Sequence, residues 1–178
     1  MARLYTYGDV LGVSQQNKWL PGQFADAWGV NLNAPAVKST SLAIEYGEVV
    51  GISGGGINSN AYTIARVTAQ TTDFAVVVRT TDGAISMEAE WIEAPRTHTP
   101  ISVYPIDSAN HYTIAVPLVD DETPTVGSAV YVSYNTDEEG AVRTDNTNGT
   151  ALTGWVFAST KYQPTDSDDY CVLIRKSV

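Results

Sequence analysis

The last third of the chain is a series of short β-type runs separated by glycine and asparagine turns. Residues 129–134 alternate small and large side chains, as a strand with two different faces requires. Turn signals stand at Gly140, at Asn148-Gly149 and at the acidic stretch 166–169, and a final apolar run covers 170–175. Residues 124–176 therefore predict a closing sheet of strands joined by turns, with no visible catalytic residue.

Similar runs occupy the middle of the chain, and together they predict an all-β fold. Strands are expected within 42–52, 62–68, 74–80, 101–106 and 112–118, the last two as a hairpin around residues 107–110. Pro117 cannot donate to a ladder, so the end of its strand should lie at a sheet edge or a bulge. Residues 86–93 fit a helical turn or an edge strand. The expected fold is a compact β-sandwich or small barrel of short antiparallel strands with an extended N-terminal arm.

The beginning of the chain differs from the rest. Residues 1–33 carry Trp19, Phe24 and Trp28 among Gly, Pro, Gln and Asn, without a sustained strand or helix period. We expect residues 1–40 to form the arm and residues 41–178 to form the β-sandwich or barrel domain. Two interpretations of the aromatic residues stay open: they insert into a partner, or they dock on the chain's own domain.

The formal net charge of −10 is concentrated in the second half of the chain. Residues 1–89 contain five basic and seven acidic residues, whereas residues 90–178 contain five and thirteen. Such a surface repels phosphates, and without a run of Lys or Arg it predicts no direct nucleic-acid binding. The longest dense apolar run, 74–78, is too short to span a membrane, and the start lacks a secretory signal. We expect a soluble protein made in a cytoplasm.

No pattern in the sequence predicts an enzyme. Residues 51–55 match G-x-S-x-G, but that motif needs a strand-to-helix turn, and the following Gly54-Gly55-Gly56 predicts a hairpin loop instead. His98 and His111 stand in loop or strand-edge contexts without a local triad pattern. Together with Cys171 they match no usual zinc ligand set, and Cys171 is expected to be a buried, small apolar residue. We therefore expect no catalytic residue, no metal and no cofactor.

Three further patterns have more than one interpretation. The acidic clusters 120–122, 137–139 and 166–169 favour charged turns over a calcium site built from two loops. Asn148-Gly149-Thr150 matches a glycosylation sequon but more simply predicts an Asn-Gly turn. Residues 45–50 resemble residues 125–130, which reflects either duplication or the shared sequence pattern of β-hairpins; the second interpretation is slightly favoured.

The order of several segments resembles the structural cement, or capsid decoration, proteins of tailed bacteriophages. Pro21-Gly22-Gln23-Phe24-Ala25-Asp26, followed by the apolar-glycine-valine run at 44–50, is similar to the opening of that family. The runs at 101–104 and 124–132, and the stretch from Asn148 through Gly154 to the last strand, are similar to its second half. The resemblance covers residues 21–176, and residues 86–99 depart from it.

This resemblance implies a β-rich virion protein that binds the outer capsid surface and bridges neighbouring major capsid proteins. It implies the major capsid protein as partner, a homo-oligomer with the trimer as one form, and no nucleic-acid or membrane partner. Large aromatic residues are typical interface anchors, so Trp19, Pro21, Phe24 and Trp28 are the expected capsid contacts. The alternatives are another virion β-protein, of the tail or the head–tail connector, and a glycan-binding or hydrolytic β-domain.

Overall fold

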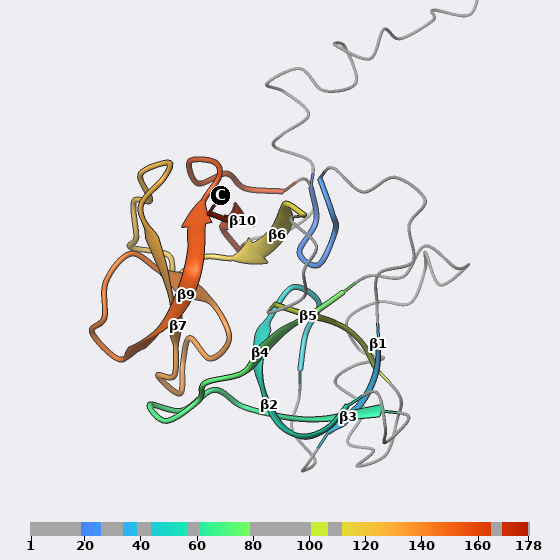
Figure 1. Ribbon diagram of the computed structural model, residues 1–178. Helices are drawn as coiled ribbons and strands as arrows, with labels where there is room; N and C mark the ends of the chain where they lie inside the picture. The colour runs from blue at the N-terminus through green and yellow to red at the C-terminus, as the bar shows by residue number, and fades with distance from the viewer. Residues whose placement is uncertain are drawn as a thin grey trace, which may run out of the picture.

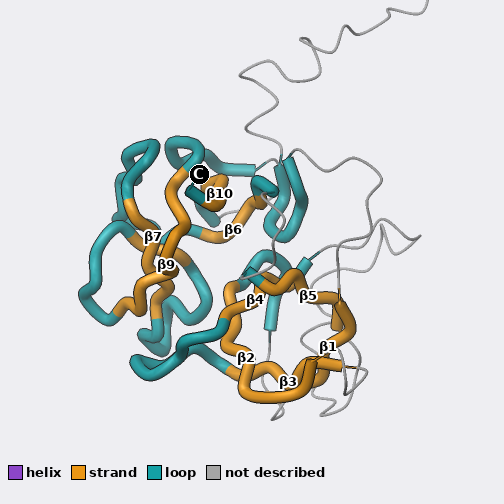
Figure 2. Tube along the Cα trace, viewed as in Figure 1, coloured by secondary structure: helices purple, strands orange, loops and turns teal. Residues whose placement is uncertain are grey.

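Ten short strands make two sheets in the part of the chain that the structure describes, and the expected all-β fold is confirmed. The computed structural model describes residues 19–25, 34–38, 44–56, 61–78, 101–106, 112–164 and 169–177. Among these residues, no helix is long and apolar enough to cross a membrane. Strands are short and loops take up much of the rest, as Figure 2 shows.

The first five strands close into a barrel, which Figure 1 shows nearly end-on. We call it the first barrel; its order is β1-β3-β2-β4-β5, and β5 also pairs with β1. All its strand pairs are antiparallel except β1 with β3, which is parallel. The bounds are β1 (Ala34–Lys38), β2 (Val49–Gly56), β3 (Ala61–Ala65), β4 (Phe74–Val77) and β5 (Ile101–Pro105).

The last five strands make what we call the second sheet, in the order β6-β10-β9-β7-β8. All its strand pairs are antiparallel. The outer strands β6 and β8 approach each other where Leu118 forms a parallel bridge with Val142 and the amide of Val119 donates to the carbonyl of Val142 at 3.0 Å. The bounds are β6 (Ile114–Pro117), β7 (Ala129–Ser133), β8 (Val142–Arg143), β9 (Gly149–Phe157) and β10 (Cys171–Lys176).

The second sheet repeats the first barrel strand for strand. Val49 pairs with Val76 in the first barrel, and Ala129 pairs with Val156 in the second sheet, each residue number being 80 higher. The bridge that closes the second sheet also has a counterpart, because Leu118–Val142 corresponds to the parallel pair Lys38–Ile64, with offsets of 80 and 78 residues. Corresponding strands are β1 and β6, β2 and β7, β3 and β8, β4 and β9, and β5 and β10.

The similarity of residues 45–50 to residues 125–130 is thus part of a structural repeat, and the preference for a shared hairpin pattern was wrong. Each segment makes a turn with glycine at positive φ, Gly47 at 85° and Gly127 at 87°. The glycine amide then donates to the facing strand, to Val77 at 2.7 Å and to Phe157 at 2.8 Å. A hairpin pattern explains each turn but does not explain why distant strands pair in the same register.

The interior of each half is built from corresponding residues. In the first barrel a core of small and branched side chains is fully buried, and in the second sheet larger side chains take four of the six corresponding positions. The corresponding buried pairs are Ala36 and Val116, Val50 and Val130, Ile64 and Val142, Ala75 and Trp155, Val77 and Phe157, and Val103 and Ile174.

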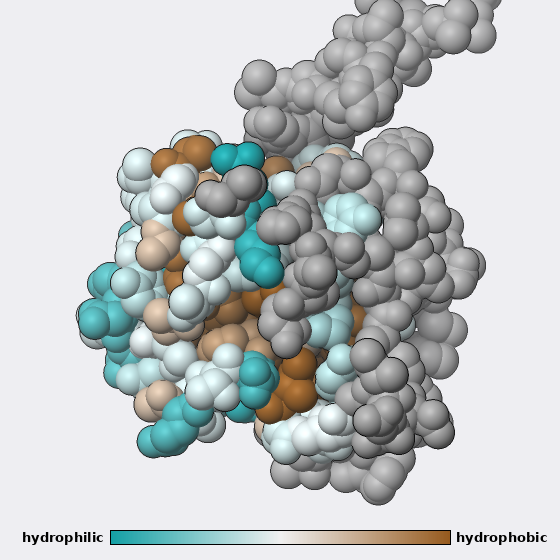
Figure 3. All heavy atoms as spheres, viewed as in Figure 1, coloured by the Kyte–Doolittle hydropathy of each residue, from teal (hydrophilic) through white to brown (hydrophobic). Residues whose placement is uncertain are grey.

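The outer face of the first barrel is buried against the second sheet. Val49, Val76 and Tyr104 belong to the same apolar cluster as the interior of the second sheet. The corresponding outer positions of the second sheet, Ala129 and Arg175, are exposed. Apolar residues are visible along the seam between the two halves in Figure 3. The two halves therefore share one continuous core.

Two sequence-based expectations need correction. Residues 101–106 and 112–118 do not form a hairpin, because β5 belongs to the first barrel and β6 to the second sheet. Both edges of β5 are already occupied by β4 and β1, so no edge is left for β6. The glycines 54–56 are not a loop but the end of β2, which pairs with β3 beyond a bulge at Ser53.

Several local predictions are confirmed. Strand β7 lies where the alternation at 129–134 predicts it and β10 where the apolar run at 170–175 predicts it, and Gly140 and Asn148 adopt positive φ in turns. Pro117 ends β6, an outer strand of its sheet, and Cys171 is fully buried. Residues 86–99 and both histidines lie outside the described residues. The division at residue 40 stays a prediction, although Ala34–Lys38, within the predicted arm, form β1.

Candidate docking surface

Residues 19–25, which we call the docked segment, begin with a tight turn around Pro21. The amide of Gln23 donates to the carbonyl of Leu20 at 3.1 Å, and Gly22 has a φ of 80°. This is the geometry of a type II turn, in which Pro fits the second position and Gly the third. The amide of Leu20 also donates to Oε1 of Gln23 at 3.0 Å. The Pro-Gly-Gln sequence therefore serves a local structural purpose.

Three backbone hydrogen bonds attach the docked segment to the outer edge of β6. The amide of Gly22 donates to Ala115 at 2.8 Å, the amide of Ala115 donates to Gln23 at 2.9 Å, and the amide of Ala25 donates to Thr113 at 2.8 Å. The segment lies beside β6 in Figure 1. An uncovered edge strand invites pairing with another chain, and the docked segment covers this one.

Phe24 places its ring between the two halves of the molecule. It packs edge-on against Tyr104 of β5, with ring centroids 5.1 Å apart, and against Tyr112, which precedes β6, at 5.9 Å. The two tyrosine rings also meet each other at 6.4 Å. Edge-to-face aromatic pairs add to the free energy gained by burial. Phe24 therefore ties the docked segment to both the first barrel and the second sheet.

Trp19 packs at the other end of the docked segment. It lies against a small apolar cluster on the outer side of β6 and β10, which includes Cys171 and Tyr162. The hydroxyl of Tyr162 donates to the carbonyl of Trp19 at 3.1 Å, and burial raises the pKa of Tyr162 above its usual range.

Of the two interpretations of the aromatic residues, docking on the chain's own domain describes Trp19 and Phe24. Contact with a partner stays a prediction for Trp19, Pro21, Phe24 and Trp28. Trp28 lies outside the described residues.

An acidic groove of about 530 Å³ opens between the first barrel and the second sheet. Pro21 of the docked segment forms part of its wall. Among the described residues, its lining contains one basic side chain, Arg66, and eight carboxylates: Glu45, Glu48, Asp120, Asp121, Asp137, Glu138, Glu139 and Asp169. Two acidic clusters that the sequence presents as separate turns, 120–122 and 137–139, thus meet at one groove. The field of this groove favours cationic groups and disfavours anions.

Arg66 links the two walls of this groove. Its Nη1 lies 2.9 Å from Glu48 of the first barrel, and its Nε lies 3.0 Å from Glu139 of the second sheet. Burial raises the pKa of Glu48 to about 7, although the neighbouring Arg66 acts in the opposite direction. No sequence pattern indicates this cluster, because its three residues come from separate turns and loops.

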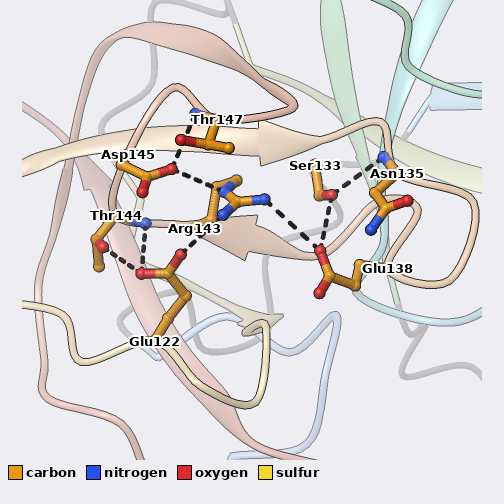
Figure 4. A network of polar contacts seen from close by, with 8 residues as sticks. All are labelled: Glu122, Ser133, Asn135, Glu138, Arg143, Thr144, Asp145 and Thr147. Atoms are coloured by element: carbon orange, nitrogen blue, oxygen red, sulfur yellow. Dashed lines mark hydrogen bonds and ion pairs between the residues drawn. The ribbon is translucent and has the colours of Figure 1, made fainter.

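A second network surrounds Arg143 on β8, as Figure 4 shows. Its guanidinium lies 3.3 Å from Glu122, 3.6 Å from Glu138 and 3.1 Å from Asp145. Glu122 also accepts hydrogen bonds from the amide and the hydroxyl of Thr144. The pKa of Asp145 is lowered, chiefly by a hydrogen bond from the backbone amide of Thr147 and also by Arg143.

The Arg143 network helps to hold the outer strands of the second sheet together, whereas strand pairing alone closes the first barrel. The first barrel closes through three parallel residue pairs between β1 and β3, whereas the second sheet has one bridge there. Glu122, which follows that bridge, holds the turn after β6 against β8. Glu138 connects Arg143 to the loop between β7 and β8, which reaches the first barrel. The network therefore shapes the groove wall.

The described residues offer no geometry for the enzymatic and metal motifs considered above. Ser53 lies in the bulge of β2, where its hydroxyl donates to the carbonyl of Thr63 at 3.2 Å, and not on a strand-to-helix turn. Among the described residues, no group of three His, Cys, Asp or Glu side chains is placed to hold a metal ion. What the described surface offers is an acidic groove and a docked aromatic segment.

Comparison with known proteins finds a matching family and a solved chain of similar fold. Residues 12–174 match the model of a protein family described as structural cement protein (E217 gp24/Pam3 gp6). A solved chain from the capsid of the myovirus phage XM1 has a similar fold, with a TM-score of 0.56 and 16% sequence identity. The similarity covers 90% of this chain and 91% of that chain. No curated protein matches the sequence significantly.

Proposed function

The chain belongs to the family of phage structural cement proteins, and from this premise we propose that it binds the outer surface of an assembled phage head and bridges neighbouring major capsid proteins. The match over residues 12–174 carries the proposal, because it includes the docked segment and both halves of the fold. The family is one of structural proteins of phage capsids. The location on the outer surface and the bridging of capsid proteins are our proposals beyond this family membership.

The continuous core supports a bridging role. Val49, Val76 and Tyr104 of the first barrel are buried in one cluster with the interior of the second sheet. Two lobes held in this way present surfaces at a fixed spacing, so little conformational entropy is lost on binding. A rigid two-lobed body is suited to hold two capsid subunits against each other.

The charge of the protein gives a second argument. The net charge of −10 and the eight carboxylates of the groove favour a partner surface that carries basic side chains.

The proposed contact residues are Trp19, Pro21, Phe24 and Trp28. We also propose a homo-oligomer, with the trimer as one arrangement, which places several copies around a capsid symmetry axis. Because Phe24 packs against Tyr104 and Tyr112, replacing it changes the stability of the fold as well as any capsid contact.

A reconstitution experiment tests the proposal. Heads assembled from the major capsid protein of the same phage are mixed with the purified protein, and the bound fraction is measured by cosedimentation. We expect saturable binding, density on the outside of the shell by electron cryomicroscopy, and a higher disruption temperature of decorated heads. Heads of an unrelated phage are the control.

Two outcomes would contradict the proposal. One is the absence of binding to heads at any stage of their maturation. The other is recovery of the protein in purified tails or connectors, which would favour the alternative of another virion β-protein.

A further inference from the structure

Beside the shared apolar core, polar contacts around Glu48 connect the first barrel to the second sheet, and we call this polar region the joint. The amide of Val49 donates to the carbonyl of Gly140 at 2.9 Å, and the hydroxyl of Thr150 donates to the carbonyl of Thr68 at 3.0 Å. The ion pairs of Arg66 with Glu48 and Glu139 lie beside the first of these bonds.

Glu48 is fixed within the first barrel and covered by the second sheet. Its carbonyl accepts from the amide of Val77 at 3.0 Å, and its side chain accepts from the amide of Glu45 at 3.1 Å. A Cβ atom added to Gly140 would lie 3.0 Å from the Cβ of Glu48, which shows how closely the β7–β8 loop approaches. Only 13% of the Glu48 side chain is exposed, so water reaches it fully only when this loop moves away.

Negative charge exceeds positive charge at the joint. Of the described residues that line the groove, Arg66 is the one cation, and it is shared by two carboxylates. Besides Arg66, the titratable groups that line the same groove are Glu45, Tyr46, Asp120, Asp121, Asp137, Glu138, Glu139 and Asp169. An ionised Glu48 adds one more negative charge where solvation is poor.

We propose that this joint is pH-sensitive: it is tight while Glu48 is protonated, and the β7–β8 loop separates more readily from the first barrel once Glu48 is a carboxylate. The geometry supplies the coupling, because the loop that covers Glu48 also carries Gly140, which accepts the hydrogen bond from Val49. Opening the joint hydrates the carboxylate and breaks that bond in the same movement. This inference concerns the protein alone and goes beyond the proposed function.

The direction of the effect follows from proton linkage. Burial raises the pKa of Glu48 from 4.5 to about 7 in the closed joint, so the closed joint binds the proton more tightly than the open joint does. Its extra stability is complete below pH 4.5 and is lost as the pH rises through 7. Between about pH 5.5 and about pH 8, these two pKa values predict a roughly 30-fold change in the opening equilibrium.

Amide hydrogen exchange of the full-length protein measures this equilibrium directly. The amide of Val49 reports on the joint, whereas the amides of Val78 and Ala158, which donate to Ser102 and Leu173, report on the first barrel and the second sheet. After correction for intrinsic exchange, we expect the protection of Val49 to fall roughly 30-fold from about pH 5.5 to about pH 8. The protection of the two reference amides should change much less.

Two variants separate Glu48 from the other carboxylates. Glu48→Gln imitates the protonated form and should remove the pH dependence of Val49 protection. Asp121→Asn removes an exposed carboxylate of the same groove and should keep the wild-type dependence. The proposal is overturned if Glu48→Gln keeps that dependence, or if all three amides change together.

A titration of the wild-type protein gives an independent test that needs no variant. Carbon-13 NMR of the Glu48 carboxyl group should show a midpoint near pH 7. A midpoint near the ordinary glutamate value of 4.5 would contradict the proposal even if Glu48→Gln fails to fold.

Discussion

Phe24 packs perpendicular to Tyr104, with ring centroids 5.1 Å apart and an angle of 89° between the ring planes. The two residues are far apart in the sequence, one on the docked segment and the other on β5 of the first barrel. Tyr112, just before β6, completes the group. One side chain of the N-terminal region therefore contacts both halves of the repeat and contributes to their fixed arrangement.

Replacing Phe24 should destabilise the whole domain. Phe24→Ala removes a partly buried ring and its two aromatic contacts, and we expect a loss of about 2–3 kcal/mol in the free energy of unfolding. Phe24→Leu, which keeps much of the apolar volume, should cost less. Urea denaturation followed by tryptophan fluorescence measures both. Equal stability of Phe24→Ala and the wild type would show that the docked segment contributes nothing to the fold.

Arg143 should matter for stability more than an isolated surface cation does. Its side chain is 12% exposed and faces Glu122 and Glu138, so Arg143→Ala leaves carboxylates without their cation at the closure of the second sheet. We expect a loss of about 2–3 kcal/mol in the free energy of unfolding. The control is Asp145→Asn, which changes a solvent-exposed partner of the same arginine and should leave the denaturation midpoint nearly unchanged. Similar losses in both variants would contradict this explanation.

Cys171 should be unreactive in the folded protein. It is fully buried in β10, beneath Trp19 and Tyr162, so a thiol reagent reaches it only after the strand or the docked segment opens. We expect slow modification by a thiol-specific dye in native buffer and rapid modification in denaturant. Phe24→Ala should accelerate the native reaction by loosening the docked segment. Rapid labelling of the native wild type would show that this face is open.

Local features of the fold could be predicted from the sequence, because adjacent residues determine them. The alternation in β7 follows from one buried face, and Gly47 and Gly127 mark turns that require positive φ. The repeat was also visible at these turns. Its extent was not, because the equivalent strands share pairing register and buried positions rather than side-chain identity or size, as Ala75 and Trp155 show.

The pairing of distant strands could not be predicted in this way. Residues 101–118 have the pattern of a hairpin, and only the occupied edges of β5 exclude it. The docked segment was equally hidden, because backbone hydrogen bonds to β6 hold it and these leave no periodic side-chain pattern. The cluster of Glu48, Arg66 and Glu139 depends on the contact between the two halves, which no local pattern contains.

The repeat supplies a matched pair of glycines that tests how the docked segment is held. Gly47 and Gly127 occupy corresponding turns with φ of 85° and 87°, so replacement by alanine imposes the same backbone strain at both positions, about 1 kcal/mol. Their surroundings differ. A Cβ atom on Gly47 would lie 2.4 Å from the Cβ of Pro21, whereas a Cβ atom on Gly127 would meet nothing within 4 Å.

Gly47→Ala should therefore cost more than Gly127→Ala, by about 1–3 kcal/mol in the free energy of unfolding. The excess reflects displacement of Pro21 and Gly22 from the first barrel, and it should vanish in a double variant that also carries Phe24→Ala, if that change already releases the segment. Urea denaturation measures the free energy of unfolding of Gly47→Ala, of Gly127→Ala and of the double variant. Limited proteolysis near residues 19–25 shows whether the segment has detached. Equal costs for the two glycine replacements would mean that the docked segment yields without loss, and that its contact with Gly47 contributes little to holding the two halves together.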